Sequence, residues 1–144
     1  VEISTQGIEM MAGNNVIPML LPVTTFFLRK DRYAPARKMI EAGCKVGVAT
    51  DFNPGSAMNQ NMQLAWSVAA LKMGLLPGEL LWATTYIPAI SLELGEKLGT
   101  IEKAKQADLI LLDIPNLEYL PYHLGINHVK MTMKKGKIIV NKLG

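Results

Sequence analysis

The fold is decided by one short stretch, Lys45-Val46-Gly47-Val48-Ala49-Thr50-Asp51. Residues 46–49 offer no polar face, which is typical of a parallel strand buried on both sides. Asp51 follows at the carboxyl end of this strand. Parallel β/α folds place their binding and catalytic groups at that edge of the sheet. The stretch therefore predicts a parallel sheet and the edge at which its chemistry would occur.

A second apolar run, residues 15–21, lies upstream and predicts another buried strand. Residues 34–42 between the two runs are predicted to form a short helix, because Pro35 suits a first helical turn and Gly43 ends the segment. A strand, a helix and a strand with short connections form a β/α unit, whose strands pair in parallel.

Further helices are predicted from apolar periodicity, from proline at a first turn or from a closing glycine. They cover residues 5–13, 62–73, 77–84 and 88–94. In the second of these, Leu64, Val68 and Leu71 recur at helical spacing and are expected to face the core. The first two thirds of the chain thus have the alternating pattern of an α/β fold.

From Gly99 onward the pattern changes to strands, which we predict at residues 107–113, 129–133 and 137–140. The last two are joined by a Gly-centred hairpin turn, and their alternation indicates antiparallel pairing. A complete β/α barrel needs about 250 residues. We therefore expect residues 1–97 to be the last strands and helices of a (β/α)8 barrel, and residues 98–144 to be part of a small β-sandwich module.

Composition and charge exclude several classes of protein. Hydrophobic residues make up 49% of the 144 residues and charged residues 19%, so the chain is expected to fold. A formal net charge of +3 is too weak and dispersed to indicate a nucleic-acid partner. The longest apolar run, Val16–Leu21, is far shorter than the ~20 residues that cross a bilayer, and no signal peptide is recognised.

The single cysteine, Cys44, cannot form an internal disulfide, which suits a reducing cytoplasm. Its neighbours are mainly apolar, so a buried and inert thiol is expected rather than a nucleophile. The chain opens at Val1 without an initiator methionine, which suggests a processed or excised fragment.

The loop after residue 50 carries the candidate functional residues. Asp51 supplies a carboxylate and Asn53 an amide, while Gly55 permits close backbone approach and Ser56 offers a hydroxyl. The alternative is that Asp51 only caps a turn and that the Asn-Pro-Gly run only bends the chain. From the residues alone, both interpretations stay open.

The two histidines, His123 and His128, lie in the predicted C-terminal module. They lack the spacing that would place both on one helix face, and no cysteine or carboxylate clusters with them. We expect them to be structural or exposed. A catalytic zinc site needs three protein ligands, so Asp51 alone cannot complete one.

The active-site stretch of imidazolonepropionases, enzymes of the amidohydrolase superfamily, resembles Thr50-Asp51-Phe52-Asn53-Pro54-Gly55-Ser56 of this chain. Residues 20–29 are similar to another segment of that family, and residues 99–113 with the hairpin at 135–137 are similar to the superfamily's C-terminal module. The resemblance is collinear over essentially the whole chain. Ala104 departs from the usual glycine, and residues 57–60 depart from the usual Ser- and Pro-rich continuation.

The resemblance implies a zinc- or iron-activated water that attacks the ring carbonyl of 4-imidazolone-5-propanoate and yields N-formimidoyl-L-glutamate, in histidine degradation. Asp51 would match the family's last metal ligand and handle the proton of the water. Asn53 and Gly55 would hold the ligand's carboxylate or the open-chain product, and Ser56 would contact the substrate. The family's metal-binding histidines have no counterpart in this chain, so we expect the isolated chain to be inactive. We also expect a homodimer, because strands left unpaired in a partial barrel invite pairing with another chain.

Two rival interpretations stay open. One is another amidohydrolase, such as a cytosine or guanine deaminase, in which the corresponding loop would be expected to lack Asn-Pro-Gly-Ser. The other is a truncated paralogue that binds or assembles without catalysis. Sequence upstream of Val1, in particular a His-x-His pair, would separate the enzymes from the paralogue.

Overall fold

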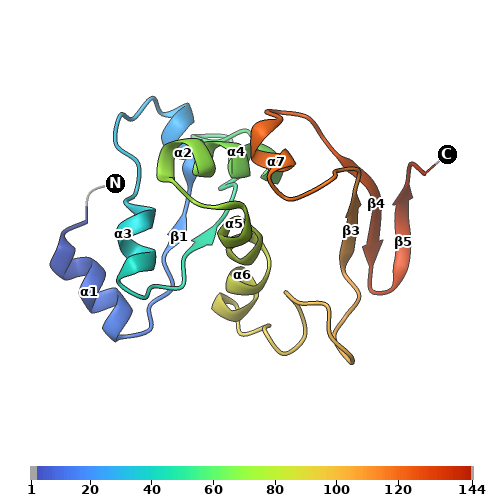
Figure 1. Cartoon of the computed structure of the whole chain (residues 1–144), viewed down its shortest axis with the longest axis horizontal. Helices are drawn as coiled ribbons and strands as arrows, with labels where there is room; N and C mark the ends of the chain where they lie inside the picture. Colours follow the sequence, from blue (N-terminus) through green and yellow to red (C-terminus); the bar gives the residue numbers. More distant parts are fainter. Residues whose placement is uncertain (1–2, 144) are drawn as a thin grey trace.

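The structure is a computed structural model and describes residues 3–143. Its elements follow in the order α1 (Thr5–Gly13), β1 (Met19–Leu20), α2 (Pro22–Phe27), α3 (Ala36–Glu41), β2 (Gly47–Val48), α4 (Met62–Met73), α5 (Pro77–Thr84), α6 (Tyr86–Ser91), β3 (Leu109–Leu112), α7 (Tyr119–Tyr122), β4 (Val129–Lys134) and β5 (Lys137–Asn141). Figure 1 shows a larger helical part around β1 and β2, and a separate sheet of β3, β4 and β5 at the C-terminal end. Within residues 3–143, no helix has the length and apolar character needed to span a membrane.

The parallel pairing predicted for the first two strands is confirmed. β1 and β2 run side by side, with Met19 opposite Gly47 and Leu20 opposite Val48. Helix α3 lies in the connection between them, as in a β/α unit. Gly47 leaves room for the Met19 side chain, because a Cβ at position 47 would lie 2.2 Å from Sδ of Met19. A larger residue here would require this methionine side chain to move.

Both strands are shorter than the apolar runs that predicted them. The first run was expected to be buried on both faces, but Val16 at its start is 48% exposed, so that expectation is wrong for this end of the run. Among the described residues each strand has a single neighbour. Val46 and Val48 are buried, as predicted for the second strand.

Helix α4 has the predicted bounds but a different inner face. Leu71, expected in the core, is 67% exposed, whereas Ala65 and Ala69 are completely buried. Small side chains on this face let α2 and α7 pack closely against the helix. Leu80 of α5 is also fully buried, and burying a leucine side chain stabilises a fold by roughly 2 kcal/mol. Cys44 is buried, as expected.

Two short helices, α2 and α7, were not predicted, and α6 begins before the predicted segment 88–94. Helix α2 has six residues and α7 has four, which is too short for an apolar period to show in the sequence. The proline that follows the first apolar run, Pro22, occupies the first turn of α2. It therefore begins a helix directly at the carboxyl end of β1.

The C-terminal sheet has the predicted antiparallel order, β3-β4-β5. Asp108 ties the start of β3 to the hairpin, because its carboxylate accepts hydrogen bonds from Nζ of Lys134 and, at 2.8 Å, from the backbone N–H of Lys135. The Lys134 bond is the main cause that lowers the pKa of Asp108 to about 2. The described residues form one sheet here, so a second, facing sheet of the expected β-sandwich does not come from this part of the chain.

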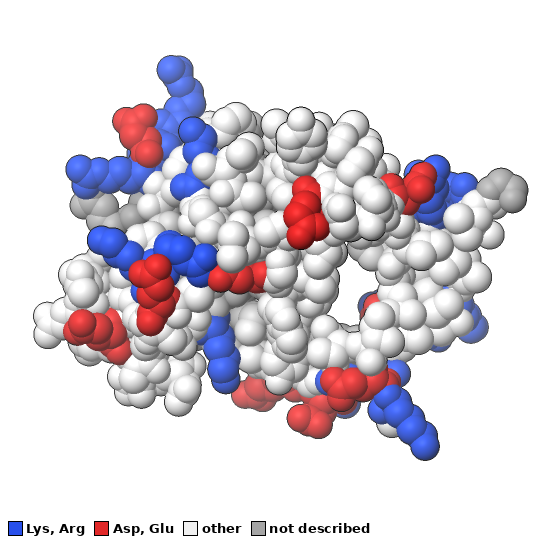
Figure 2. Space-filling view, viewed as in Figure 1, with Lys and Arg blue, Asp and Glu red and all other residues white. Residues whose placement is uncertain are grey.

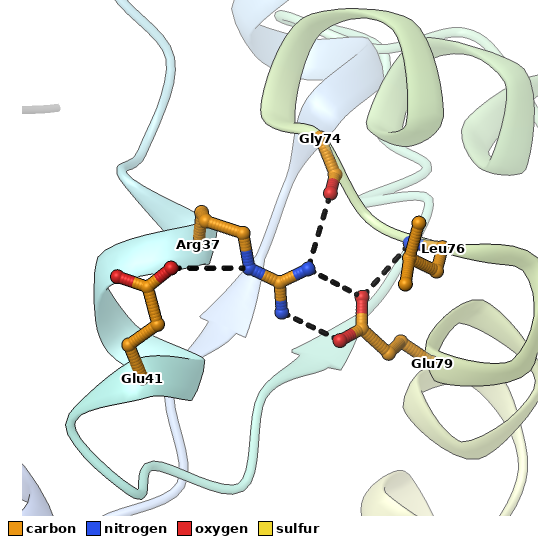
Figure 3. Close-up of polar contacts among 5 residues, drawn as sticks. All are labelled: Arg37, Glu41, Gly74, Leu76 and Glu79. Atoms are coloured by element: carbon orange, nitrogen blue, oxygen red, sulfur yellow. Dashed lines mark hydrogen bonds and ion pairs between the residues drawn. The ribbon is translucent and has the colours of Figure 1, made fainter.

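An ion pair, here called the clasp, joins α3 to the first turn of α5 (Figure 3). The guanidinium of Arg37 donates from Nη1 to Oε2 of Glu79 at 3.0 Å and from Nη2 to Oε1 at 2.5 Å. Oε2 of Glu79 also accepts from the backbone N–H of Leu76 at 2.8 Å, which satisfies an otherwise unpaired donor at the start of α5. The bidentate pair joins residues 42 positions apart in the sequence.

This clasp predicts a pH-dependent contribution to stability. The Arg37 hydrogen bonds lower the pKa of Glu79 below its ordinary value of 4.5, so the contribution is present above that pH and is lost as the pH falls through the folded-state pKa. Glu79→Gln is expected to lower the free energy of unfolding by about 1 kcal/mol at pH 7, because both groups are partly solvated. Urea denaturation of the wild type and the variant at pH 7 and pH 3 measures the difference between their free energies of unfolding. This difference should shrink at the lower pH.

The matched control is Glu41→Gln, which removes the other carboxylate near Arg37. Glu41 lies 3.8 Å from Nε of Arg37 and its side chain is 67% exposed, so its removal should change stability little. If the two substitutions lower the free energy of unfolding equally at pH 7, the Arg37–Glu79 pair contributes no more than the exposed Glu41 pair.

Candidate functional site

The candidate site lies where β1 and β2 end. Because the two strands are parallel, α2 and the loop that begins at residue 49 leave the sheet at the same edge. Asp51 adopts φ +53°, a left-handed conformation that is uncommon for a residue other than glycine. Such backbone strain is concentrated at functional sites, where the surrounding structure holds it in place.

The carboxylate of Asp51 is held by a residue of the neighbouring element. Thr24, in the middle of α2, donates from Oγ1 to Oδ2 of Asp51 at 2.8 Å. Both residues are half-buried. Within residues 3–143, no donor contacts Oδ1, so one carboxylate oxygen is engaged and the other is open.

Asn53 holds the loop together from inside. Its Oδ1 accepts from the backbone N–H of Gly55 at 2.9 Å and of Ser56 at 2.8 Å, while Nδ2 donates to the carbonyl of Asp51 at 2.6 Å. The backbones of Asn53 and Ala57 form an antiparallel bridge across the turn. The loop therefore has a defined shape that depends on the Asn53 amide.

The four predicted site residues thus lie in one loop, but they differ in which of their groups are exposed and which are already hydrogen-bonded. Gly55 is exposed and Ser56 is half-buried, with Oγ 3.1 Å from Nδ2 of Asn53. Both hydrogens of the Asn53 amide are used within the loop. A ligand could reach this amide only by displacing one of these bonds.

The residues present fit a metal only in part. An aspartate oxygen is a suitable donor for a hard cation, and Oδ1 of Asp51 is open to one. Among the residues that the structure describes, no three His, Cys, Asp or Glu side chains are grouped so that they could hold an ion. Asp51 therefore offers a single ligand, and the others must come from outside these residues.

The histidines lie in an aromatic cluster beside α7. The ring of His123 stacks on Tyr119 with centroids 3.5 Å apart, and His128, only 9% exposed, packs edge-on against Tyr119. The backbone N–H of His128 donates to Oε1 of Gln63 at 3.0 Å, which joins the cluster to α4. These contacts hold both rings within the fold, while Nε2 of His128 is buried without a hydrogen-bond partner among the described residues. That these histidines are structural stays a prediction.

A cavity of about 800 Å³ lies elsewhere, between α4 and α5 on one side and the C-terminal sheet on the other. Its lining is largely apolar and includes Trp66, Leu81, Leu109 and Leu112, with no residue of the loop 51–56. Figure 2 shows an opening between these two parts of the molecule and, on this face, acidic and basic side chains that are interspersed. The one carboxylate in its described lining, Asp108, precedes an antiparallel strand and is already bonded to Lys134 and Lys135, so we place the candidate site at Asp51.

Thr24 is the residue of the site that the sequence analysis missed. The available signal was a hydroxyl two residues after the Pro22 that follows the first strand. Recognising it required both strands to be placed in parallel, so that a side chain just beyond one strand would lie next to a side chain just beyond the other.

Comparison with known proteins gives the family. The sequence profile described as the amidohydrolase family matches residues 5–139. The imidazolonepropionase of Alkaliphilus oremlandii is 46% identical over 139 residues, which are 96% of this chain and 33% of the relative. That of Treponema denticola is 45% identical over 140 residues, 97% of this chain and 34% of the relative. The chain spans about a third of the length of the curated relatives it matches.

The fold is also found in solved structures. A zinc-bound adenosine deaminase from Xanthomonas campestris superposes with a TM-score of 0.88 at 23% identity, over 98% of this chain and 36% of that chain. At this identity the likeness shows the fold alone, which is a fragment of the amidohydrolase barrel; the described strands do not close into a barrel. Because the family profile covers nearly the whole chain and the fold agrees with it, the chain belongs to the amidohydrolase family.

Proposed function

We propose that this chain is the C-terminal part of an imidazolonepropionase, a metal-dependent hydrolase that opens 4-imidazolone-5-propanoate to N-formimidoyl-L-glutamate in histidine degradation. One observation carries the proposal. Asp51 lies at the carboxyl end of a parallel strand, with one oxygen held and the other open, in a chain 46% identical to an imidazolonepropionase. The rest of the site would come from the two thirds of the relatives that this chain does not cover.

In this proposal, Asp51 is both a metal ligand and a proton acceptor. Bound zinc or iron would lower the pKa of a coordinated water to about 7, so that it reacts at neutral pH. Asp51 takes a proton from the attacking water and returns it to the ring nitrogen as the carbon–nitrogen bond breaks. Water thus adds a hydroxyl group to the carbonyl carbon and a hydrogen to the nitrogen, which balances the hydrolysis.

The remaining loop residues would position the ligand. Ser56 offers a half-buried hydroxyl to the substrate, and Gly55 an exposed backbone next to it. Asn53 and Gly55 are proposed to hold the ligand's carboxylate or the open-chain product. Since the Asn53 amide already bonds within the loop, its contribution would combine ligand contact with support of the loop.

The proposal extends to the organisation of the protein. Residues 1–97 would complete a (β/α)8 barrel with the upstream chain, and residues 98–144 would join further strands in a β-sandwich module. We propose a cytoplasmic homodimer with a small-molecule substrate and neither nucleic-acid nor membrane partners.

The test is the substrate preference of the purified full-length protein. We expect metal-dependent turnover of 4-imidazolone-5-propanoate, monitored by the loss of its ultraviolet absorbance. We expect no release of ammonia from cytosine or guanine. Nucleobase deamination without imidazolonepropionate hydrolysis would replace the proposal with its deaminase rival. A folded protein inactive on all three substrates after metal loading would instead support the non-catalytic paralogue.

A further inference from the structure

Thr24 and Thr25 are adjacent threonines in one short helix, yet their hydroxyls have different partners. Oγ1 of Thr25 donates to the carbonyl of Leu21 at 3.1 Å, within the same helical turn. Oγ1 of Thr24 instead crosses to Asp51, 27 positions away in the sequence. A helical threonine can satisfy its hydroxyl locally, so the Thr24 bond is a specific link between α2 and the loop that carries Asp51.

The hydrogen bond from Thr24 fixes the side chain of Asp51, whose backbone is already held by Asn53. The carbonyl of Asp51 accepts a hydrogen bond from Nδ2 of Asn53 at 2.6 Å, and its φ is +53°. The backbone contact leaves the carboxylate free to rotate about the side-chain bonds. Thr24 removes that freedom from a different element, so the position of Oδ1 follows from both contacts.

Helix α2 is a firm support for this hydroxyl. It begins at Pro22, one residue after the paired strand β1, and Pro22, Val23 and Thr25 are buried. Thr24 is therefore joined through a short and packed segment to the strand that pairs with β2. Thr24 lies four residues after β1 and Asp51 three residues after β2, so both ends of the hydrogen bond are close to the paired strands.

We propose that Thr24 is a positioning residue for Asp51, which it orients so that the open oxygen faces the metal. This inference rests on the proposed function, in which Asp51 is a ligand. Carboxylates that bind metals are themselves hydrogen-bonded, and removing such a supporting partner typically lowers metal affinity or activity about 10- to 100-fold. Thr24 and the open Oδ1 have this arrangement.

The experiment compares four forms of the full-length protein: wild type, Thr24→Val, Thr24→Ser and Thr25→Val. Zinc affinity is measured by competition with a chelator, and kcat and KM are measured with 4-imidazolone-5-propanoate. Thr24→Val keeps the shape of the side chain but removes the donor, so zinc affinity or kcat should fall about 10- to 100-fold while KM changes far less. Thr24→Ser keeps the donor and should restore most of the loss.

Thr25→Val is the matched control, since it removes the neighbouring hydroxyl from the same helix without touching Asp51. Zinc affinity and kcat for Thr24→Val within twofold of those for Thr25→Val would overturn the inference. If Thr24→Val does not fold, as judged by circular dichroism, Thr24→Ala and Thr25→Ala take over the same comparison.

The two proposals can fail separately. A wild type that binds zinc but does not hydrolyse the substrate would refute the proposed function, and the zinc affinities of the variants would still decide the role of Thr24. A wild type that binds neither zinc nor iron would overturn both.

Discussion

Asp51→Asn in the full-length protein is expected to abolish hydrolysis, with a fall in kcat of roughly 100- to 10,000-fold. An amide neither accepts the proton of the water nor binds a hard cation as a carboxylate does. It can still accept the Thr24 hydrogen bond, so the loop should keep its shape. Initial rates with 4-imidazolone-5-propanoate measure the loss, and far-UV circular dichroism checks that the fold is retained.

The control for this substitution is Asp113→Asn, at the end of β3. Among the described residues, the carboxylate of Asp113 forms an ion pair only with Lys130, at 3.2 Å. The Asp113 side chain is largely exposed. Its removal should leave turnover within about twofold of wild type, because exposed pairs contribute little. Turnover of the Asp51→Asn protein within tenfold of wild type would remove Asp51 from the chemistry.

The isolated 144-residue chain is expected to show no hydrolysis and to associate with itself. Among residues 3–143, the edge strand β5 has no partner on its outer side, and Ile139 within it is 62% exposed. Unpaired strand edges and exposed apolar faces invite pairing with another chain. β1 and β2 each have one free edge as well. Sedimentation velocity should therefore give a dimer or larger species, which we expect to be joined through strands or exchanged segments.

Ile139→Lys tests whether β5 takes part, because a charge on an edge strand opposes pairing with another copy. The variant should shift the sedimentation profile towards monomer. A compact monomer of the unmodified chain at high protein concentration would contradict the association. Metal-dependent turnover by the isolated chain would contradict the claim that its site is incomplete.

Local signals were sufficient for much of the fold. The bounds of α4 and α5 were predicted because the apolar spacing in α4 and the proline in the first turn of α5 are properties of neighbouring residues. Parallel pairing of β1 with β2 followed from two fully apolar runs and a short crossover, and the hairpin around Gly136 followed from its turn residues. Helices α2 and α7 were not predicted, because six and four residues are too few to show a helical period of apolar residues.

The candidate site, like the fold, was predicted from the sequence only in part. A carboxylate at the end of a buried strand marked Asp51, and the resemblance of the loop brought in Asn53, Gly55 and Ser56. That the Asn53 amide is used within the loop could not be read from the sequence, because it depends on the turn's backbone conformation.

The sequence by itself determined most of the secondary elements, the parallel and antiparallel pairing, the edge of the sheet that carries the candidate chemistry and the family. Tertiary structure alone decided which face of α4 is buried, with Ala65 inside and Leu71 exposed, and which hydroxyl reaches Asp51. The reason is physical. Periodicity and turn chemistry act between residues a few positions apart, whereas burial and the hydrogen bond from Thr24 depend on elements that meet only when the strands pair.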